Sequence, residues 1–224
     1  MAFRIFGDPV IFHVGAVPVT ETMFSSLGVS LALIAAALIL RHAIRNHPDS
    51  TLATVAKLAF GWLDETVTEV IGRPAPAVVT LAGTLFIFIA ACNLSGQLPG
   101  VHPATASLTT TSALAVVVIL AVPVAGIRAR GFGGYMKHYF RPNPILFPLH
   151  LVSEVSRTVA LAMRLFGNIM SGHLVVGLLV ALAGFLVPIP FMALDLLIGL
   201  LQAYIFAILS TVFIGAAMGE GEGE

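Results

Sequence analysis

Charged side chains are scarce in this sequence. Of its 224 residues only 10% are charged, with 11 Lys and Arg balancing 11 Asp and Glu, whereas 58% are hydrophobic. Soluble domains carry about 25% charged residues, so the composition excludes an ordinary soluble enzyme and a disordered chain. The net charge of zero leaves no basic field to attract phosphates, which excludes a nucleic-acid partner. The composition indicates an integral membrane protein that contacts the lipid bilayer.

Cysteine and known catalytic motifs are also lacking. The single cysteine, Cys92, lies in an apolar run, so we expect neither a disulfide framework nor a cysteine metal site. The histidines show no metal-ligand spacing, and we expect no metal and no other cofactor. A P-loop, a nucleophile elbow and a dinucleotide fingerprint are all missing. The sequence therefore predicts no catalytic residue and no nucleotide site, and it favours ion movement over chemistry on a substrate.

Long apolar runs, in contrast, are abundant. A bilayer core of roughly 30 Å needs about 20 apolar residues per helix, and the runs at 23–40, 77–94 and 108–127 have about this length. We expect a single all-α polytopic membrane domain over 1–224 with about five membrane helices. The segment 1–22 is then an external N-terminal segment.

The last two membrane helices are predicted to form a hairpin. Pro188 and Pro190 interrupt the apolar region that follows the third span. The pattern predicts helices over 145–182 and 191–218, joined by a turn at 183–190. Because the first of these helices is too long for a perpendicular span, we expect it to tilt or to begin along the membrane surface.

The segment 50–72 leaves two alternatives open. Its apolar residues recur at helical spacing, which is typical of an interfacial helix that turns its charged residues outward. A short cytosolic hairpin fits the same segment. The apolar positions are Leu52, Val55, Leu58, Ala59 and Leu63, and the charged positions are Lys57, Asp64, Glu65 and Glu69.

Lysine and arginine gather in alternate connections between the spans. The connections 93–106 and 183–190 contain neither residue. By the positive-inside rule, the N-terminus lies outside, the connection near 41–76 is cytoplasmic, and the acidic tail 219–224 ends in the cytoplasm. The basic residues that decide this are Arg41 and Arg45 after the first span, and Arg128, Arg130, Lys137 and Arg141 after the third.

Polar residues inside the last two helices carry most of the functional evidence, because a central arginine costs from about 2.5 to over 10 kcal/mol in a bilayer. At about 100° per residue, Arg157, Arg164 and Asn168 share one stripe, and His173 points to the opposite side. Arg157 can also simply mark the cytoplasmic boundary, and His150 can be a solvated residue at the start of the helix. The candidates are His150, Glu154, Arg157, Arg164, Asn168 and His173 on the first helix, and Asp195 and Gln202 on the second.

Folding the hairpin near residue 184 predicts two polar layers. Arg164 then lies level with Gln202, and His173 lies level with Asp195. Since histidine and a desolvated aspartate can both titrate near neutral pH, the His–Asp layer predicts a proton path from outside. Structural alternatives are a salt bridge of Arg164 with Asp195 or Glu154, a neutral His–Asp pair, and amides that only join helices.

Four motifs resemble those of a known family. The pair SR at 156–157, followed by AMRLFGN at 162–168, resembles the "SR…LRLFGN" signature of subunit a of the rotary F-type ATP synthase membrane sector. The segments 86–100 (FIFIAACNLSGQLPG), 103–111 (PATASLTTT) and 201–206 (LQAYIF) are similar to further motifs of that family. All four follow the order of the family.

The resemblance implies a non-catalytic stator subunit whose two half-channels carry protons to and from a ring of c subunits. Proton flow is thereby coupled to rotation and to ATP synthesis or hydrolysis. The hairpin 145–218 then packs against the c ring, Arg164 faces the ring carboxylate, and the positions of His173 and Asp195 line the outer channel. The resemblance also implies peripheral-stalk b subunits and other ATP synthase subunits as partners, in a bacterial-type inner (plasma) membrane.

We hypothesise that a proton enters past Asp195 and His173 and neutralises a ring carboxylate. After rotation the ring site meets Arg164, whose charge drives release near Glu154. Transport of Na⁺ by a member of the same family is one alternative. Two others belong to different classes: a stand-alone ion channel or carrier, and a structural anchor whose charges merely pair.

Overall fold

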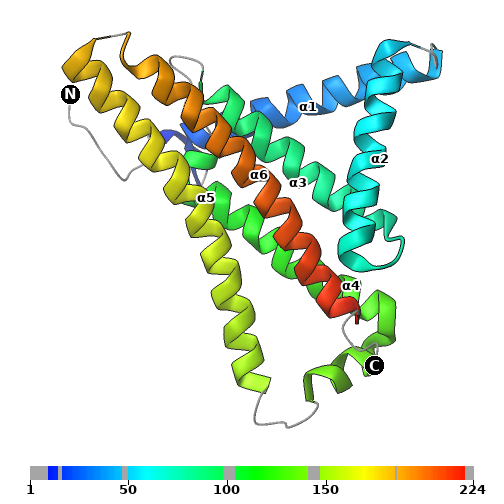
Figure 1. Ribbon diagram of the computed structural model, residues 1–224. Helices are drawn as coiled ribbons and strands as arrows, with labels where there is room; N and C mark the ends of the chain where they lie inside the picture. Colours follow the sequence, from blue (N-terminus) through cyan, green and yellow to red (C-terminus); the bar gives the residue numbers. More distant parts are fainter. Residues whose placement is uncertain are drawn as a thin grey trace.

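The chain folds into a bundle of long helices (Figure 1). The computed structural model describes residues 10–14, 17–46, 50–97, 104–140, 147–184 and 186–219. Five of the helices in these ranges are long and apolar enough to cross a membrane. The predicted all-α polytopic class is confirmed.

The elements follow one another along the chain with short connections. A β-hairpin, which is an addition to the expected helices, precedes the first of them; its β-branched and aromatic residues are typical of strands. Residues 1–9 of the expected external segment, and 220–224 of the expected tail, lie outside the described residues. The elements are β1 (Val10–Val14), β2 (Val17–Thr20), α1 (Glu21–Asn46), α2 (Thr51–Ile71), α3 (Pro76–Ser95), the short 3-10 helix η1 (Ala104–Ala106), α4 (Leu108–Phe140), α5 (Phe147–Ala183) and α6 (Pro188–Met218).

Helix α6 belongs to both apolar clusters of the bundle. Towards its end, Ile214 packs in a cluster with Val67 of α2 and Val79 of α3. In its middle, Phe206 packs with Leu165 of α5 and with residues of α3 and α4. Because lipid tails are as apolar as these side chains, close packing rather than exclusion of water holds such helices together in a bilayer.

The α5–α6 turn is shorter than predicted. Helix α5 ends at Ala183 and α6 begins at Pro188, so the connection is 184–187 rather than 183–190. Proline at the start of a helix loses no intrahelical hydrogen bond, and its fixed φ suits the first turn. Gly184, with φ +76°, supplies the left-handed backbone conformation that ends α5.

Helix α4 continues past its expected end at residue 127. It runs to Phe140, with a non-helical kink at Gly131 (φ 75°, ψ 161°). The apolar run therefore predicts the length of the membrane span and not the length of the helix. The kink falls at a glycine because a residue without Cβ adopts a positive φ without steric cost.

The segment 50–72 is one continuous helix, α2, and the hairpin alternative is wrong. The Ser50 hydroxyl accepts a hydrogen bond from the backbone N–H of Ala53 at 3.2 Å, which caps the first turn. Gly72, with φ 75°, ends the helix in the left-handed conformation.

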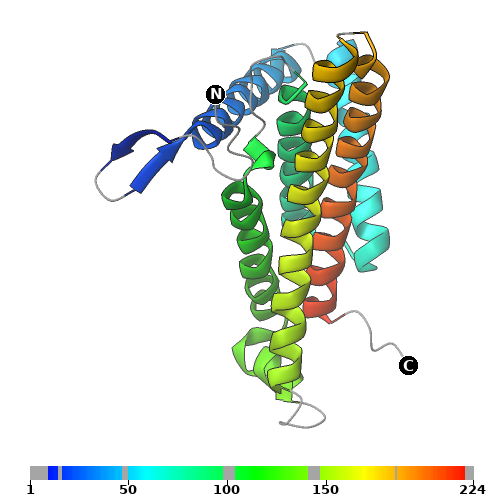
Figure 2. The same cartoon turned by 90° about the vertical axis from the view of Figure 1, so that its left-hand side faces the viewer.

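Most of the apolar stripe expected on α2 does not face the protein, although Leu63 at its end packs against Gly83 of α3. Leu52, Val55 and Leu58 are all more than half exposed. Helix α2 instead packs on α6, where the Trp62 ring stacks on Tyr204 with 6.0 Å between centroids. The exposed stripe suits a helix that lies against lipid, and α2 runs along the bundle beside α6 (Figure 2).

The helices differ in how they contribute to the bundle. Helices α5 and α6 lie side by side as an antiparallel hairpin on one face (Figure 2). Helix α1 crosses the others at a steep angle, and α2 lies along the side reached by the end of α1 (Figure 1). None of the apolar span of α1 is buried within the chain, so this helix leaves a large surface for lipid or for neighbouring subunits.

Candidate functional site

A close contact between α5 and α6 fixes the register of the hairpin. The Asp195 carboxylate of α6 lies against the backbone of Gly172 in α5, where even a methyl group would overlap with it. The contact places Asp195 level with a point one residue before His173, close to the pairing predicted from the sequence. The same register brings Arg164 to within one residue of the level of Gln202.

Asp195 also belongs to a set of polar contacts between α3, η1 and α6. The Gln97 Nε2 group donates a hydrogen bond to Asp195 Oδ2 at 3.4 Å. Four residues along α6, Asn93 Nδ2 donates to the carbonyl oxygen of Gly199 at 2.7 Å. Thr105 Oγ1 donates to Asn93 Oδ1 at 3.1 Å. Both Asn93 and Thr105 are buried, so these contacts join three elements inside the bundle.

Asn93, Gln97 and Thr105 are absent from the predicted site residues. Their signal in the sequence is an asparagine and a glutamine at the end of an apolar run, in the segment 86–100. That signal shows polar groups in a membrane helix, but it does not show which neighbouring helix they meet. Gly199 makes the meeting possible, since a Cβ there would lie only 3.0 Å from Asn93 Nδ2.

Two amide groups in the hairpin lack hydrogen-bond partners among the described residues. They are Asn168 Nδ2 on α5 and Gln202 Nε2 on α6, and both atoms are buried. An unsatisfied buried donor costs about 1–3 kcal/mol, so such groups in a folded protein call for a specific reason. Both residues were predicted as site residues, and the structure places both within the hairpin as unsatisfied donors.

Arg164 lies on the exposed side of α5. Its neighbour Leu165 is fully buried in the core, whereas Arg164 itself is exposed. Among the described residues, Arg164 forms no hydrogen bond and no ion pair. The alternative of a salt bridge to Asp195 or Glu154 is therefore not realised in the described part of the chain.

The remaining predicted residues lie on the first half of α5 or beside Asp195. The Arg157 guanidinium stacks over the Phe213 ring of α6 at 4.6 Å from its centroid, a contact that holds α5 and α6 together beyond Arg164. Glu154 is half-buried. His150 and His173 belong to α5, and their side chains lie outside the described part of the structure.

No metal centre is found among the described residues. They contain no group of three or more His, Cys, Asp or Glu side chains placed to hold a metal ion. What the described site offers is a carboxylate, amides, hydroxyls and an exposed guanidinium. Such groups can bind water and pass protons, but they form no nucleophile–base pair for covalent chemistry.

Comparison with known proteins identifies the family. A family model described as ATP synthase A chain matches residues 22–215. The chain belongs to the ATP synthase subunit a family. It is 42% identical over 210 residues to "ATP synthase subunit a 2" of Bradyrhizobium sp. (strain BTAi1 / ATCC BAA-1182), a match that covers 94% of each chain.

Two further subunit a relatives extend this similarity. "ATP synthase subunit a 1" of Hahella chejuensis is 40% identical over 94% of this chain and 89% of its own. "ATP synthase subunit a" of Albidiferax ferrireducens is 40% identical over 96% of this chain and 94% of its own. The resemblance found in the four motifs is confirmed, and with it a multi-pass membrane protein that works within an ATP synthase.

The contact of Gly172 with Asp195 yields a prediction for this subunit a. We expect Gly172→Ala to destabilise the chain by about 1–3 kcal/mol, as other overpacked sites do, because the new methyl group overlaps with the carboxylate. The midpoint of thermal unfolding of the purified complex, and its ATP-driven proton pumping, both measure the effect. Gly177→Ala on the same helix is the matched control, since a Cβ there meets nothing within 4 Å. Equal behaviour of the two variants would show that the contact does not matter.

Proposed function

We propose that this chain forms the stationary walls of two offset half-channels for protons, which serve a ring of c subunits. The observation that carries the proposal is Arg164, an exposed cation on a membrane helix that meets no partner among the described residues. An isolated charge among apolar side chains in a bilayer is too costly to persist. A carboxylate on the neighbouring ring supplies the counter-charge, and it does so only while that ring site faces this chain.

The outer half-channel runs past Asp195 in this proposal. The carboxylate lies where α3, α5 and α6 meet, held by Gln97 and Gly172. A carboxylate in such a place can take up and release a proton, and His173 follows Gly172 directly on α5. The unsatisfied amides of Asn168 and Gln202 then continue the polar path along the hairpin towards Arg164.

The inner half-channel begins beyond Arg164 and leads past Glu154. A ring carboxylate that has been neutralised from the outer side can turn through lipid, which a charged carboxylate cannot do. When it reaches Arg164, the positive charge favours its ionised form and drives the proton off towards Glu154. Arg164 also repels protons and hydronium, so it prevents a direct leak between the half-channels. Each proton contributes about 2.3 kcal/mol per 100 mV of membrane potential.

The proposal also orients the chain in the membrane. Arg73 follows the end of α2, and Arg128 and Arg130 lie within α4; the positive-inside rule then assigns this end of the bundle to the cytoplasm. The α5–α6 turn and the end of α3 then face outside. The exposed surface of α1 gives the peripheral-stalk b subunits a place to pack.

The role of Arg164 is tested by replacing it. We expect Arg164→Ala to abolish ATP-driven acidification of vesicles that contain the whole complex, because a ring carboxylate no longer loses its proton at this chain. Arg45→Ala, which removes an exposed arginine from the end of α1, is the control and should pump normally. Normal pumping by Arg164→Ala would contradict the proposal. Measuring pumping by the wild-type complex with and without Na⁺ shows which ion is transported. A strict requirement for Na⁺ would overturn the assignment of protons.

Replacing Asp195 by asparagine distinguishes a role in proton transfer from a purely structural role. Asp195→Asn keeps the size of the side chain and an oxygen that accepts from Gln97, but it removes the titratable group. We therefore expect the complex to assemble in wild-type amounts and to pump protons far more slowly, since a relay group typically speeds proton transfer by about 10²–10⁴. Initial rates of acidification, normalised to assembled complex, measure the loss. Unchanged rates would mean that Asp195 only holds the hairpin together.

A further inference from the structure

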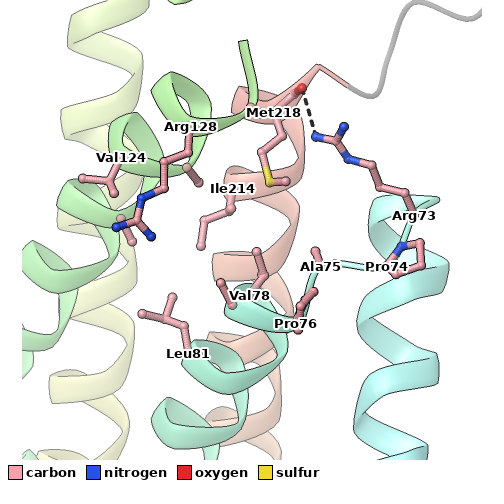
Figure 3. Close-up of a pocket in the computed structure, with 14 residues that line it drawn as sticks. Arg73, Pro74, Ala75, Pro76, Val78, Leu81, Val124, Arg128, Ile214 and Met218 are labelled. Atoms are coloured by element: carbon pink, nitrogen blue, oxygen red, sulfur yellow. Dashed lines mark hydrogen bonds between the residues drawn. The ribbon is translucent and has the colours of Figure 1, made fainter. Parts of the chain in front are cut away.

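A pocket of about 490 Å³ lies between α3, α4 and α6, and the described residues that line it include none of the site residues discussed above. It is formed where the connection from α2 reaches α3, beside the end of α6 (Figure 3). Twelve of the fourteen residues that line it are apolar, and the other two are Arg73 and Arg128. Its volume is within the range of sites that bind small molecules, about 300–1,000 Å³.

The two arginines lie on opposite sides of this pocket (Figure 3). Arg73 is held in place by a hydrogen bond from its Nη2 to the carbonyl oxygen of Met218 at 3.4 Å. Arg128, on α4, is exposed and forms no hydrogen bond or ion pair with any described residue. The described residues that line the pocket include no acidic side chain.

The start of α3 adds to the positive potential. Ala75 precedes the helix without a side-chain cap, Pro76 opens it, and its first turn contains no acidic residue. Pro76 has no N–H, and the N–H groups of Val78 and Val79 donate to the carbonyl oxygen of Ala75 at 2.9 and 3.1 Å. This end of α3 therefore contributes the partial positive charge of the helix dipole rather than free donors. Ala75, Pro76 and Val78 line the pocket, so this end of the helix dipole and both arginines act on the same space.

We propose that this pocket binds an anionic phospholipid, with its phosphate between the two arginines and an acyl chain along the apolar wall. The wall is made by Val78, Leu81 and Ile214 (Figure 3), which offer contacts to hydrocarbon and none to a soluble anion. Val124, at the rim, is 50% exposed and lies within the apolar span of α4, so the pocket opens towards lipid. Basic pockets between membrane helices bind anionic head groups in this way.

The lipid has a structural role in this proposal. Met218 closes α6, and its carbonyl oxygen accepts hydrogen bonds from Arg73 and from Arg130 Nε at 3.3 Å. A lipid phosphate between Arg73 and Arg128 ties the start of α3, the middle of α4 and the end of α6 together. The lipid thus braces the end of the helix that belongs to both apolar clusters.

The test uses the whole complex in vesicles that contain photoactivatable phosphatidylglycerol, and in parallel vesicles that contain photoactivatable phosphatidylcholine. Mass spectrometry of peptides from the start of α3 and the middle of α4 reports the labelling. We expect labelling by phosphatidylglycerol only, and about a fivefold loss in Arg128→Gln, since one arginine contributes roughly that factor near an anionic lipid. Arg128→Lys should keep most of the labelling, and Arg41→Gln, which removes an exposed arginine from α1, should keep all of it.

A second variant separates binding in the pocket from attraction to a basic surface. Ala125→Phe fills the pocket and leaves both arginines in place, and we expect it to abolish the labelling. Three results would overturn the proposal: equal labelling by the two lipids, unchanged labelling in Arg128→Gln, or unchanged labelling in Ala125→Phe. If the chain's own acidic end or a neighbouring subunit fills the pocket instead, the wild-type pocket is not labelled by phosphatidylglycerol, and this result too would overturn the proposal.

Discussion

A guanidinium on an apolar helix face is the constraint on which the rest of this structure depends. Arg164 is exposed beside the fully buried Leu165, so the packing of α5 itself turns the charge away from the core. In a bilayer that position is stable only beside a counter-charge or water. In the function we propose, carboxylates of a neighbouring c ring supply this counter-charge, and their movement past Arg164 couples charge to rotation.

The rest of the hairpin supports that arrangement through close backbone contacts. Gly172 and Gly199 let side chains from neighbouring helices approach, so that Asp195 meets α5 and Asn93 meets α6. Larger residues at these positions would separate the helices and open the polar layer to lipid. The hydrophobic effect adds little between helices in a bilayer, so stability rests on these contacts and on the packing around Phe206. The two glycines of α5 and α6 therefore allow the contacts that position the polar residues of the hairpin.

Much of this was predictable from the sequence, for identifiable reasons. Apolar length alone locates the five spans, and the pairing of Asp195 with the region of His173 follows from folding two helices about a short turn. Contacts that depend on which faces meet were not predictable: the stacking of Trp62 on Tyr204 and the bond from Asn93 to Gly199. Periodicity gives the apolar stripe of α2, but a stripe can face either lipid or protein. The α6 boundary differs because Pro188 begins a helix as readily as it interrupts one.

Cross-linking between this chain and the c ring tests the central claim most directly. Gly167→Cys places a thiol on the exposed side of α5 beside Arg164, where a Cβ meets nothing within 4 Å. Ala162→Cys places one on the buried side of the same helix. With a cysteine next to the ring carboxylate, oxidation of the assembled complex should join the ring to Gly167→Cys and not to Ala162→Cys. Equal cross-linking of both variants, or none with Gly167→Cys, would contradict the claim that Arg164 faces the ring.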